Sequence, residues 1–134
     1  MQFKTDFITY QGIYRTIYTE KLNIPTSEGR RTILSNHMPI IIPMEVGVIE
    51  TLEDGKLQHY AVNNGVLYFK ENVAEVVADS VFDVRELDID LAKSEIEKAE
   101  KIIAESRREY EKLRYQQRLA VMNNLLKAAE KYNI

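Results

Sequence analysis

The sequence predicts an α+β protein, with an antiparallel β-sandwich or flattened barrel over residues 1–86 and an antiparallel two-helix hairpin over residues 87–134. Two observations carry this prediction. In the first 85 or so residues, apolar and β-branched side chains recur at about every second position, which is the period of a half-buried strand. From Leu87 onward the period becomes three and four residues, as on a helix, and no Gly or Pro follows Gly65.

The strands of the predicted sandwich are short and separated by turn residues. Two runs rich in β-branched and aromatic residues come first, at 3–9 and 13–19. Asp54-Gly55 and Asn63-Asn64-Gly65 contain residue pairs that tolerate positive φ in tight hairpins, so both predict reversals of the chain. Many short strands with regular turns indicate a sandwich or flattened barrel. The remaining predicted strands are Lys21–Ile24, Thr32–Leu34, Ile40–Ile42, Val46–Leu52, Leu57–Val62, Val66–Phe69 and Val73–Ala78.

Two apolar seams predict the helices, and the polar stretch Glu105–Glu109 lies between them. Because the seams are out of register across this stretch, we expect an antiparallel hairpin; one continuous helix is the alternative. Asp88 and Asp90 suit the positive end of the first helix. The first seam consists of Ile89, Ala92, Ile96, Ala99 and Ile103, and the second of Tyr115, Leu119, Met122, Leu126 and Ala129.

The helical seams are narrow, with about five inward positions on each helix. Full burial of a large aliphatic side chain contributes about 1.5–3 kcal/mol, whereas ordering one backbone residue costs about 1–2 kcal/mol. The hairpin should therefore be marginally stable unless it docks on another surface. Low local stability is what a movable element requires.

Composition limits the chemistry that the chain can perform. It contains no cysteine, which excludes disulfides, a thiolate nucleophile and a zinc–cysteine cluster. No phosphate-binding loop, HExxH or GxSxG motif occurs, and no spacing joins the acidic, serine and histidine residues into a catalytic set. We therefore expect a non-catalytic protein without a metal or cofactor, in which His37 has a structural or interface role and His59 a surface or edge role.

The net charge of −3 is unevenly distributed. Residues 1–88 carry 13 Asp and Glu against 8 Lys and Arg, whereas residues 89–134 carry 8 against 10. Such a tail is too weakly basic for nucleic-acid binding but suits an acidic protein surface. No apolar run approaches the roughly 18 residues of a membrane-spanning helix. The N-terminus lacks the pattern of a secretion signal, which predicts a chain that stays inside the cell.

A motif in the strand-rich half connects the chain to a known family. The family carries Gly-x-x-Gly-x-Leu-Pro-x-His-x-Pro, and the same spacing here gives Gly29, Thr32, Leu34, Ser35, His37 and Pro39. The order and coverage of this and later pieces resemble the epsilon subunits of proton-translocating F-type ATP synthases. The chain departs from the family pattern at three positions, where Thr32 and Asn64 replace glycines and Ser35 replaces a proline. The later pieces are Ile40–Pro43, Gly47-Val48, Asn64-Gly65-Val66, Val76–Asp79 and Leu87-Asp88.

The resemblance implies a subunit of the central stalk that has no catalytic site of its own. Its sandwich would grip the gamma subunit and rest on the c-ring, passing torque between them without entering the lipid. The implied c-ring contact is the turn Glu28, Gly29, Arg30 and Arg31, and the implied gamma contacts are His37 and Pro39 in the segment 37–43. An ordinary hairpin loop and an ordinary buried strand are the alternatives for these two segments.

The resemblance also implies an inhibitory role for the helical pair. In an extended form, the pair would reach along gamma into the catalytic head and obstruct rotation in the hydrolysis direction. Arg107, Arg114 and Arg118 lie on one flank of the second seam and would meet an acidic loop of the beta subunits. The alternative is a solvated face on which Glu111 pairs with Arg114 or Arg118.

Some members of the family hold ATP through an Ile/Leu-Asp-x-x-Arg-Ala motif. The corresponding residues here run from Leu87 to Ala92, with Leu91 in place of the arginine and Phe82 in place of an upstream acidic residue. Asp88 and Ala92 are the remnant of the motif. A charge-assisted hydrogen bond of the missing kind contributes about 1.5–3 kcal/mol, so we expect ATP binding to be weak or absent.

The resemblance implies a peripheral location on the cytoplasmic face of the cell membrane, with membrane contact only through the complex. The alternative function is a free-standing adaptor whose sandwich presents the helical hairpin to a partner protein. A flexible linker or an apolar, Met-rich hairpin face would favour the adaptor, but residues 83–90 contain no Gly, Pro or Ser.

Overall fold

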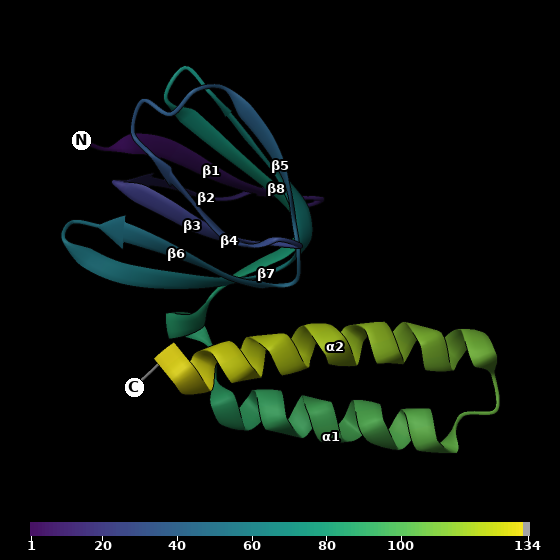
Figure 1. Cartoon of the computed structure of the whole chain (residues 1–134). Helices are drawn as coiled ribbons and strands as arrows, with labels where there is room; N and C mark the ends of the chain where they lie inside the picture. Colours follow the sequence, from purple (N-terminus) through teal and green to yellow (C-terminus); the bar gives the residue numbers. More distant parts are fainter. Residues whose placement is uncertain (133–134) are drawn as a thin grey trace. The chain divides into compact units, whose positions relative to one another are not determined.

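The computed structural model describes residues 1–132 and confirms the predicted fold class (Figure 1). Within this range, eight strands come first and two α-helices follow. The chain divides into two compact units between Asp83 and Val84, whereas the sequence places the boundary at residue 86. The strands are β1 (Phe3–Thr9), β2 (Gly12–Thr19), β3 (Lys21–Thr26), β4 (Gly29–Leu34), β5 (Ile40–Met44), β6 (Gly47–Glu53), β7 (Lys56–Lys70) and β8 (Val73–Asp83).

The strands form a hydrogen-bonded sheet that folds over into two layers (Figure 1). Its order is β2-β1-β8-β7-β6-β3-β4, and β5 pairs with β7 off this path. Neighbouring strands run antiparallel except β1 and β8, which pair in parallel between Lys4–Ile8 and Val73–Val77. The predicted sandwich is therefore present, with one parallel pair where the last strand returns to the first.

The turn predicted at Asn63-Asn64-Gly65 is wrong, because β7 continues through it without reversing. Before this point β7 pairs with β6, and from Gly65 onward it pairs with β5, so one strand passes from one layer to the other. Asn64 adopts φ +32° at the bend. A Cβ at Gly65 would collide with the carbonyl oxygen of Val77 and with Ala78 on β8. The Asn-Gly pair thus permits a corner of the sandwich instead of a hairpin.

Alternate side chains along the strands form the apolar core. Phe3 and Phe69 meet edge to face with ring centroids 5.3 Å apart, and the ring of Phe7 lies 4.7 Å from that of Tyr60. Thr32, the first departure from the family motif, lies within β4 opposite Asn23 and has no positive φ. A glycine is therefore not required at this position.

The helical unit has the predicted hairpin, and the continuous-helix alternative is wrong. Helix α1 (Ile89–Glu105) and helix α2 (Glu109–Tyr132) are separated by residues 106–108. Ala92, Ile96, Ala99 and Ala129 of the two predicted seams are buried. The other second-seam residues are only half-buried, as expected for a thin interface. Leu125 and Ala128 are buried although the seams omit them. No helix within residues 1–132 is long and apolar enough to span a membrane.

Candidate partner-binding surfaces

The sandwich carries a groove of about 770 Å³ where β5, β7 and β8 lie side by side. Register places Ile41 of β5 opposite Tyr68 of β7, and Tyr68 opposite Glu75 of β8. These three side chains share the outward face, because successive residues of a strand point to opposite sides. The lining residues are Pro39, Ile40, Ile41, Tyr68, Phe69, Lys70, Glu71, Val73 and Glu75.

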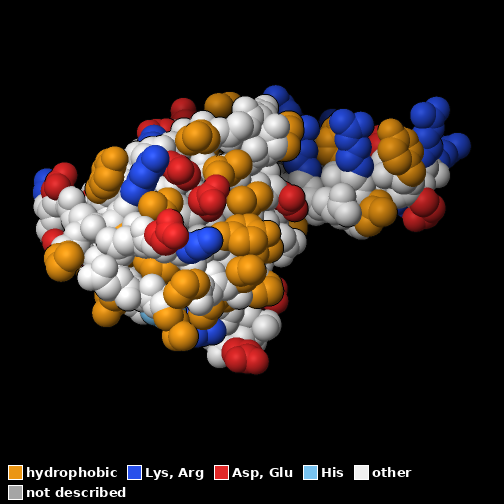
Figure 2. All heavy atoms as spheres, turned by 90° about the horizontal axis from the view of Figure 1, so that it is seen from above, with side chains coloured by type: hydrophobic (Ala, Val, Ile, Leu, Met, Phe, Trp, Pro, Cys, Tyr) orange, Lys and Arg blue, Asp and Glu red, His pale blue; other side chains and the backbone are white. Residues whose placement is uncertain are grey.

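Apolar side chains on the outer face of this groove are exposed to solvent. Ile41 is 66% exposed and Tyr68 is 43% exposed, and Val73 and Val77 on β8 are also exposed. Figure 2 shows apolar side chains gathered on the sandwich, with acidic and basic side chains between them. A contiguous apolar patch rimmed by charge marks an interaction surface more often than an isolated exposed residue does. Sequence reasoning included Ile41 only as part of the implied gamma segment 37–43 and missed Tyr68, although the unbroken run Ile40-Ile41-Ile42 was a signal that both faces of β5 are apolar.

The predicted gamma contacts His37 and Pro39 lie beside this groove. Pro39 forms part of its lining. The His37 ring lies edge-on to Phe69, with centroids 6.0 Å apart, and its Nδ1 is 2.7 Å from the carbonyl oxygen of Met38. The structure thus brings both residues to one surface, and the partner that they contact stays a prediction.

The predicted c-ring contact is the exposed turn that joins β3 to β4. Thr26 Oγ1 accepts a hydrogen bond from the Glu28 amide at 3.2 Å and donates to the Gly29 carbonyl at 2.6 Å. Gly29 adopts φ +107°, which favours glycine. Arg30 is tied to the sheet by a bond from its Nε to Asn23 Oδ1 at 2.5 Å. Arg31 is exposed on the same strand.

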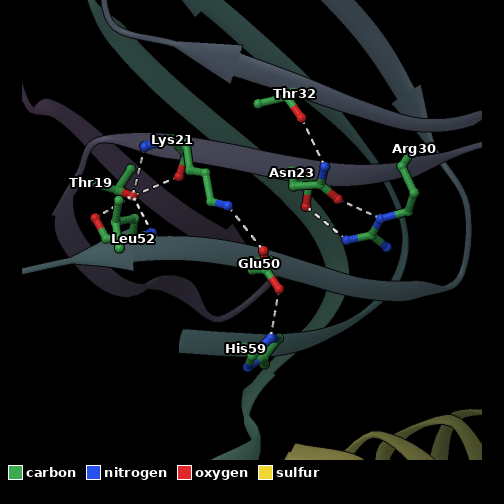
Figure 3. A network of polar contacts seen from close by, with 8 residues as sticks. All are labelled: Thr19, Lys21, Asn23, Arg30, Thr32, Glu50, Leu52 and His59. Atoms are coloured by element: carbon green, nitrogen blue, oxygen red, sulfur yellow. Dashed lines mark hydrogen bonds and ion pairs between the residues drawn. The ribbon is translucent and has the colours of Figure 1, made fainter. Parts of the chain in front are cut away.

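A polar ladder crosses the sheet from β4 to β7 (Figure 3). Cross-strand pairing sets Thr32 opposite Asn23, Asn23 opposite Glu50, and Glu50 opposite His59. Glu50 accepts from Lys21 Nζ at 3.1 Å and lies 3.0 Å from His59 Nε2. Burial acts to raise the pKa of Glu50, but the contacts with His59 and Lys21 outweigh it, so that pKa lies below its usual value.

The location of His59 differs from its predicted edge role. It lies on β7, which has strand neighbours on both sides, and its side chain is largely buried. The ladder is therefore part of the folded sheet, in contrast to the apolar groove.

The strand-rich unit ends at Asp83, whose carboxylate is buried. The Asp83 side chain is 1% exposed and forms an ion pair with Arg15 Nη1 at 2.5 Å. The hydroxyl of Tyr14 accepts a hydrogen bond from the Asp83 amide at 3.1 Å. Because Asp83 is the last residue of β8, these bonds fix the point at which the second unit begins.

The residues of the remnant ATP motif, Asp88, Leu91 and Ala92, do not share one surface. The carboxylate of Asp88 caps α1 by accepting from the Leu91 amide at 3.1 Å. Leu91 is 58% exposed, whereas Ala92 is buried. Asp88 thus has a structural role at the helix N-terminus. Within residues 1–132, no cluster of three or more His, Cys, Asp or Glu could hold a metal ion.

The predicted basic residues of the helical unit are all exposed. Arg107 lies in the link between the helices, and Arg114 and Arg118 lie on α2. Arg118 also borders a hollow of about 250 Å³ between the helices, with Lys98. No ion pair joins Glu111 to Arg114 or Arg118 in the described part of the chain, whereas the exposure of the three arginines fits both a docking cluster and a solvated face. Figure 2 shows basic side chains gathered on the helical pair.

Solved structures with the same fold come from two ATP synthases. A chain of the Euglena gracilis mitochondrial ATP synthase, in a structure of OSCP, F1 and c-ring, superposes with a TM-score of 0.71 at 18% identity, covering 95% of this chain and 81% of that one. A chain from the central stalk and c-ring of the Tetrahymena thermophila mitochondrial enzyme gives a TM-score of 0.56 at 12% identity, covering 94% and 95%. At these identities, the likeness establishes the fold.

Sequence relatives extend over both units of the chain. The "ATP synthase epsilon chain" of Caldicellulosiruptor bescii is 30% identical over 96% of this chain and 94% of its own length. That of Lactobacillus helveticus is 28% identical over 98% of this chain and 92% of its own length. The family described as "ATP synthase, Delta/Epsilon chain, beta-sandwich domain" matches residues 2–84. The chain therefore belongs to the epsilon-chain family of the F-type ATP synthases.

Proposed function

We propose that the chain is a non-catalytic central-stalk subunit that couples the rotor to the catalytic head and restrains ATP hydrolysis through its helical pair. The observation that carries the coupling role is the exposed apolar groove beside β5 and β8. Its partner is the gamma subunit, because a shaft that rotates with the sandwich requires a lasting, desolvated contact. The turn Glu28–Arg31 supplies the c-ring contact, which is polar and exposed. The chain reaches the membrane only through the complex, on its cytoplasmic face.

A charge placed in the groove tests the gamma contact. Ile41→Glu should weaken binding to the gamma subunit by tenfold or more, since burial of an isoleucine contributes about 1.5–3 kcal/mol and the new carboxylate would be desolvated. Leu57→Glu is the matched control, because Leu57 is also an exposed aliphatic residue on a strand but lies outside the groove. Calorimetric titration with gamma measures both. Equal affinities for the two variants would contradict the assignment of the groove to gamma.

The inhibitory role rests on the thin helical interface and the exposed arginines. A half-buried seam between α1 and α2 makes separation of the helices inexpensive, and the arginines offer positive charge to the acidic loops of the beta subunits. This role is tested in the assembled enzyme by comparing the full chain with one that ends at Asp88. Faster ATP hydrolysis with the shortened chain supports inhibition. Unchanged hydrolysis contradicts it while leaving the coupling role intact.

A second pair of variants distinguishes a specific role of the three arginines in inhibition from an effect of the net charge of the helical pair. Replacement of Arg107, Arg114 and Arg118 by glutamine should relieve the inhibition. Replacement of Lys101, Lys127 and Lys131 removes the same charge from other exposed positions of the helical pair and should not. If the lysine variant relieves inhibition equally, net charge and not a docked arginine cluster is responsible.

ATP is not a ligand of this chain in the proposed function. Asp88 is engaged as the helix cap and Leu91 has no donor for a phosphate or ribose oxygen. Calorimetric titration of the isolated chain should show no micromolar ATP binding. The free-standing adaptor gains no support, because the relatives that match the chain are subunits of a complex.

A further inference from the structure

The turn Leu34–His37, beside the groove, has a geometry that favours proline at its second position, but that position is a serine. The His37 amide donates to the Leu34 carbonyl at 3.1 Å, which closes a β-turn over Leu34–His37. Asn36 adopts φ +65° whereas Ser35 does not have a positive φ. This combination is typical of a type II turn, whose first central position favours proline because proline presets φ. Ser35 occupies that position and leaves φ unrestrained.

A single side chain from a different turn supplies the missing restraint. Asn72, between β7 and β8, accepts two hydrogen bonds at its Oδ1: one from the Asn36 amide at 2.7 Å and one from the Ser35 hydroxyl at 3.3 Å. Asn72 itself adopts φ +62°, which asparagine tolerates better than most residues. One carboxamide oxygen therefore ties together two turns that are 36 residues apart in sequence.

Both turns border the groove. Glu71 and Val73, the neighbours of Asn72, line it on one side, and Pro39, which follows the Leu34–His37 turn, lines it on another. The His37 ring also packs against Phe69 in the groove floor. The bonds made by Asn72 therefore join the turn before Pro39 to the turn between Glu71 and Val73, both at the rim of the groove.

We propose that Asn72 is a positioning residue for the partner-binding groove, fixing the turn that presents His37 and Pro39 in the shape that gamma must match. This inference rests on the proposed function of the groove. If this turn already has its bound conformation in the free chain, no conformational entropy is lost in ordering it when gamma binds. Binding is then stronger without any new contact. Asn72 acts through the turn, so its effect should be reproduced by any other means of holding the turn.

Two variants of Asn72 separate the effect of its carboxamide from that of its backbone conformation. Asn72→Gly keeps positive φ accessible and removes the acceptor. Asn72→Asp keeps both an acceptor and tolerance of that φ. In the full chain, Asn72→Gly should weaken gamma binding roughly two- to tenfold, the range expected for the loss of one net hydrogen bond, and should accelerate hydrogen exchange of the Asn36 amide. Asn72→Asp should retain both properties.

Ser35→Pro provides the rescue. Ser35 lies beyond the last paired residue of β4, Leu34, so proline removes no ladder bond there. Added to Asn72→Gly, it should restore gamma binding by fixing φ of the turn. Because proline at a compatible position can also stabilise a fold, the urea unfolding midpoint is measured with gamma binding: weaker binding by an Asn72→Gly chain that is still fully folded, restored by Ser35→Pro, identifies positioning.

Three results would each overturn the inference. In the first, Asn72→Gly accelerates hydrogen exchange at the Asn36 amide but binds gamma as tightly as the unchanged chain, so that the bond exists without positioning the groove. In the second, Asn72→Asp loses as much affinity as Asn72→Gly. In the third, Ser35→Pro restores none of the lost affinity. Failure of the proposed function is recognised separately, because Ile41→Glu would then leave gamma binding intact.

Discussion

Gly65 is the residue whose replacement tests the architecture most directly. It lies where β7 leaves β6 and joins β5, opposite Ala78 of β8. A Cβ at this position would lie 2.9 Å from Ala78 Cα and 3.0 Å from Ala78 Cβ, and closer still to the Val77 carbonyl oxygen. These atoms belong mainly to the backbone of a paired strand and cannot rotate away, so β7 and β8 would have to separate locally.

The sign and size of the effect follow from two opposing contributions. Gly→Ala restricts the unfolded chain and, where the native φ and ψ are compatible, stabilises by about 0.4–1 kcal/mol. Overpacking in a close contact costs about 1–3 kcal/mol, and the loss of a ladder hydrogen bond adds about 0.5–1.5 kcal/mol. We therefore expect Gly65→Ala to lower the free energy of unfolding by roughly 0.5–4 kcal/mol, the difference between these contributions.

Urea denaturation followed by circular dichroism measures this change, with Gly12→Ala as the matched control. A Cβ at Gly12 meets no atom within 4 Å, and its cost arises only from φ +108°. Ala78→Gly in the Gly65→Ala background removes one clashing atom but leaves the Val77 carbonyl, so it should not restore stability fully. A Gly65→Ala protein as stable as the parent would refute the close approach of β7 and β8 at this corner.

Three further predictions concern ionisable side chains. Asp83→Asn removes the carboxylate from the ion pair with Arg15 and should lower the free energy of unfolding by roughly 2–4 kcal/mol. Asp79→Asn, at an exposed position of the same strand, should change it by less than about 0.5 kcal/mol. Equal effects of the two substitutions would refute a role of Asp83 in holding the end of β8. Burial acts to raise the pKa of Glu50, but the contacts with His59 and Lys21 outweigh burial and bring that pKa below its ordinary value of 4.5. The ionised Glu50 therefore stabilises the folded protein above pH 4.5, and this stabilisation is lost as the pH falls through the folded-state pKa. Glu50→Gln should abolish this loss, and unfolding midpoints that fall equally with acid in both proteins would contradict it. Burial and a neighbouring carboxylate raise the pKa of Tyr60 above its ordinary value of 10, so stability should decline as the pH rises beyond about 10; Tyr60→Phe should reduce that decline and Tyr10→Phe, at an exposed turn, should not.

The sequence predicts the elements well because their periods are local properties. The change from a period of two to one of three and four at Leu87 locates the strand-to-helix transition, and α1 begins at Ile89. The polar stretch after Glu105 gives the break between the helices, since no apolar seam could continue across it. The cap formed by Asp88 also follows from residue type and position alone.

The corner in β7 could not be predicted from local chemistry. Asn64-Gly65 favours both a tight reversal and a bend, and the choice depends on the strands that lie on either side. Those strands, β5 and β6, both precede β7 in sequence, and only their arrangement in space shows that β7 pairs with each in turn. Local residue preferences contain no information about such partners.

The groove on the sandwich was predicted only in part. His37 and Pro39 come from a motif, but Ile41, Tyr68 and Val73 come from three strands and share a face only once the register is set. The role of Asn72 depends on two loops that are distant in sequence. Arrangements of this kind are properties of tertiary structure and are invisible to periodicity.

The 15 residues of β7 give the sandwich a mechanical property. Because one continuous backbone belongs to both layers, sliding of one layer over the other would have to change the backbone dihedral angles of β7 as well as displace side chains. A pull entering at the hairpin between β6 and β7 is carried along that backbone to the rim near Lys70. The two layers are therefore coupled along β7 and resist being displaced separately.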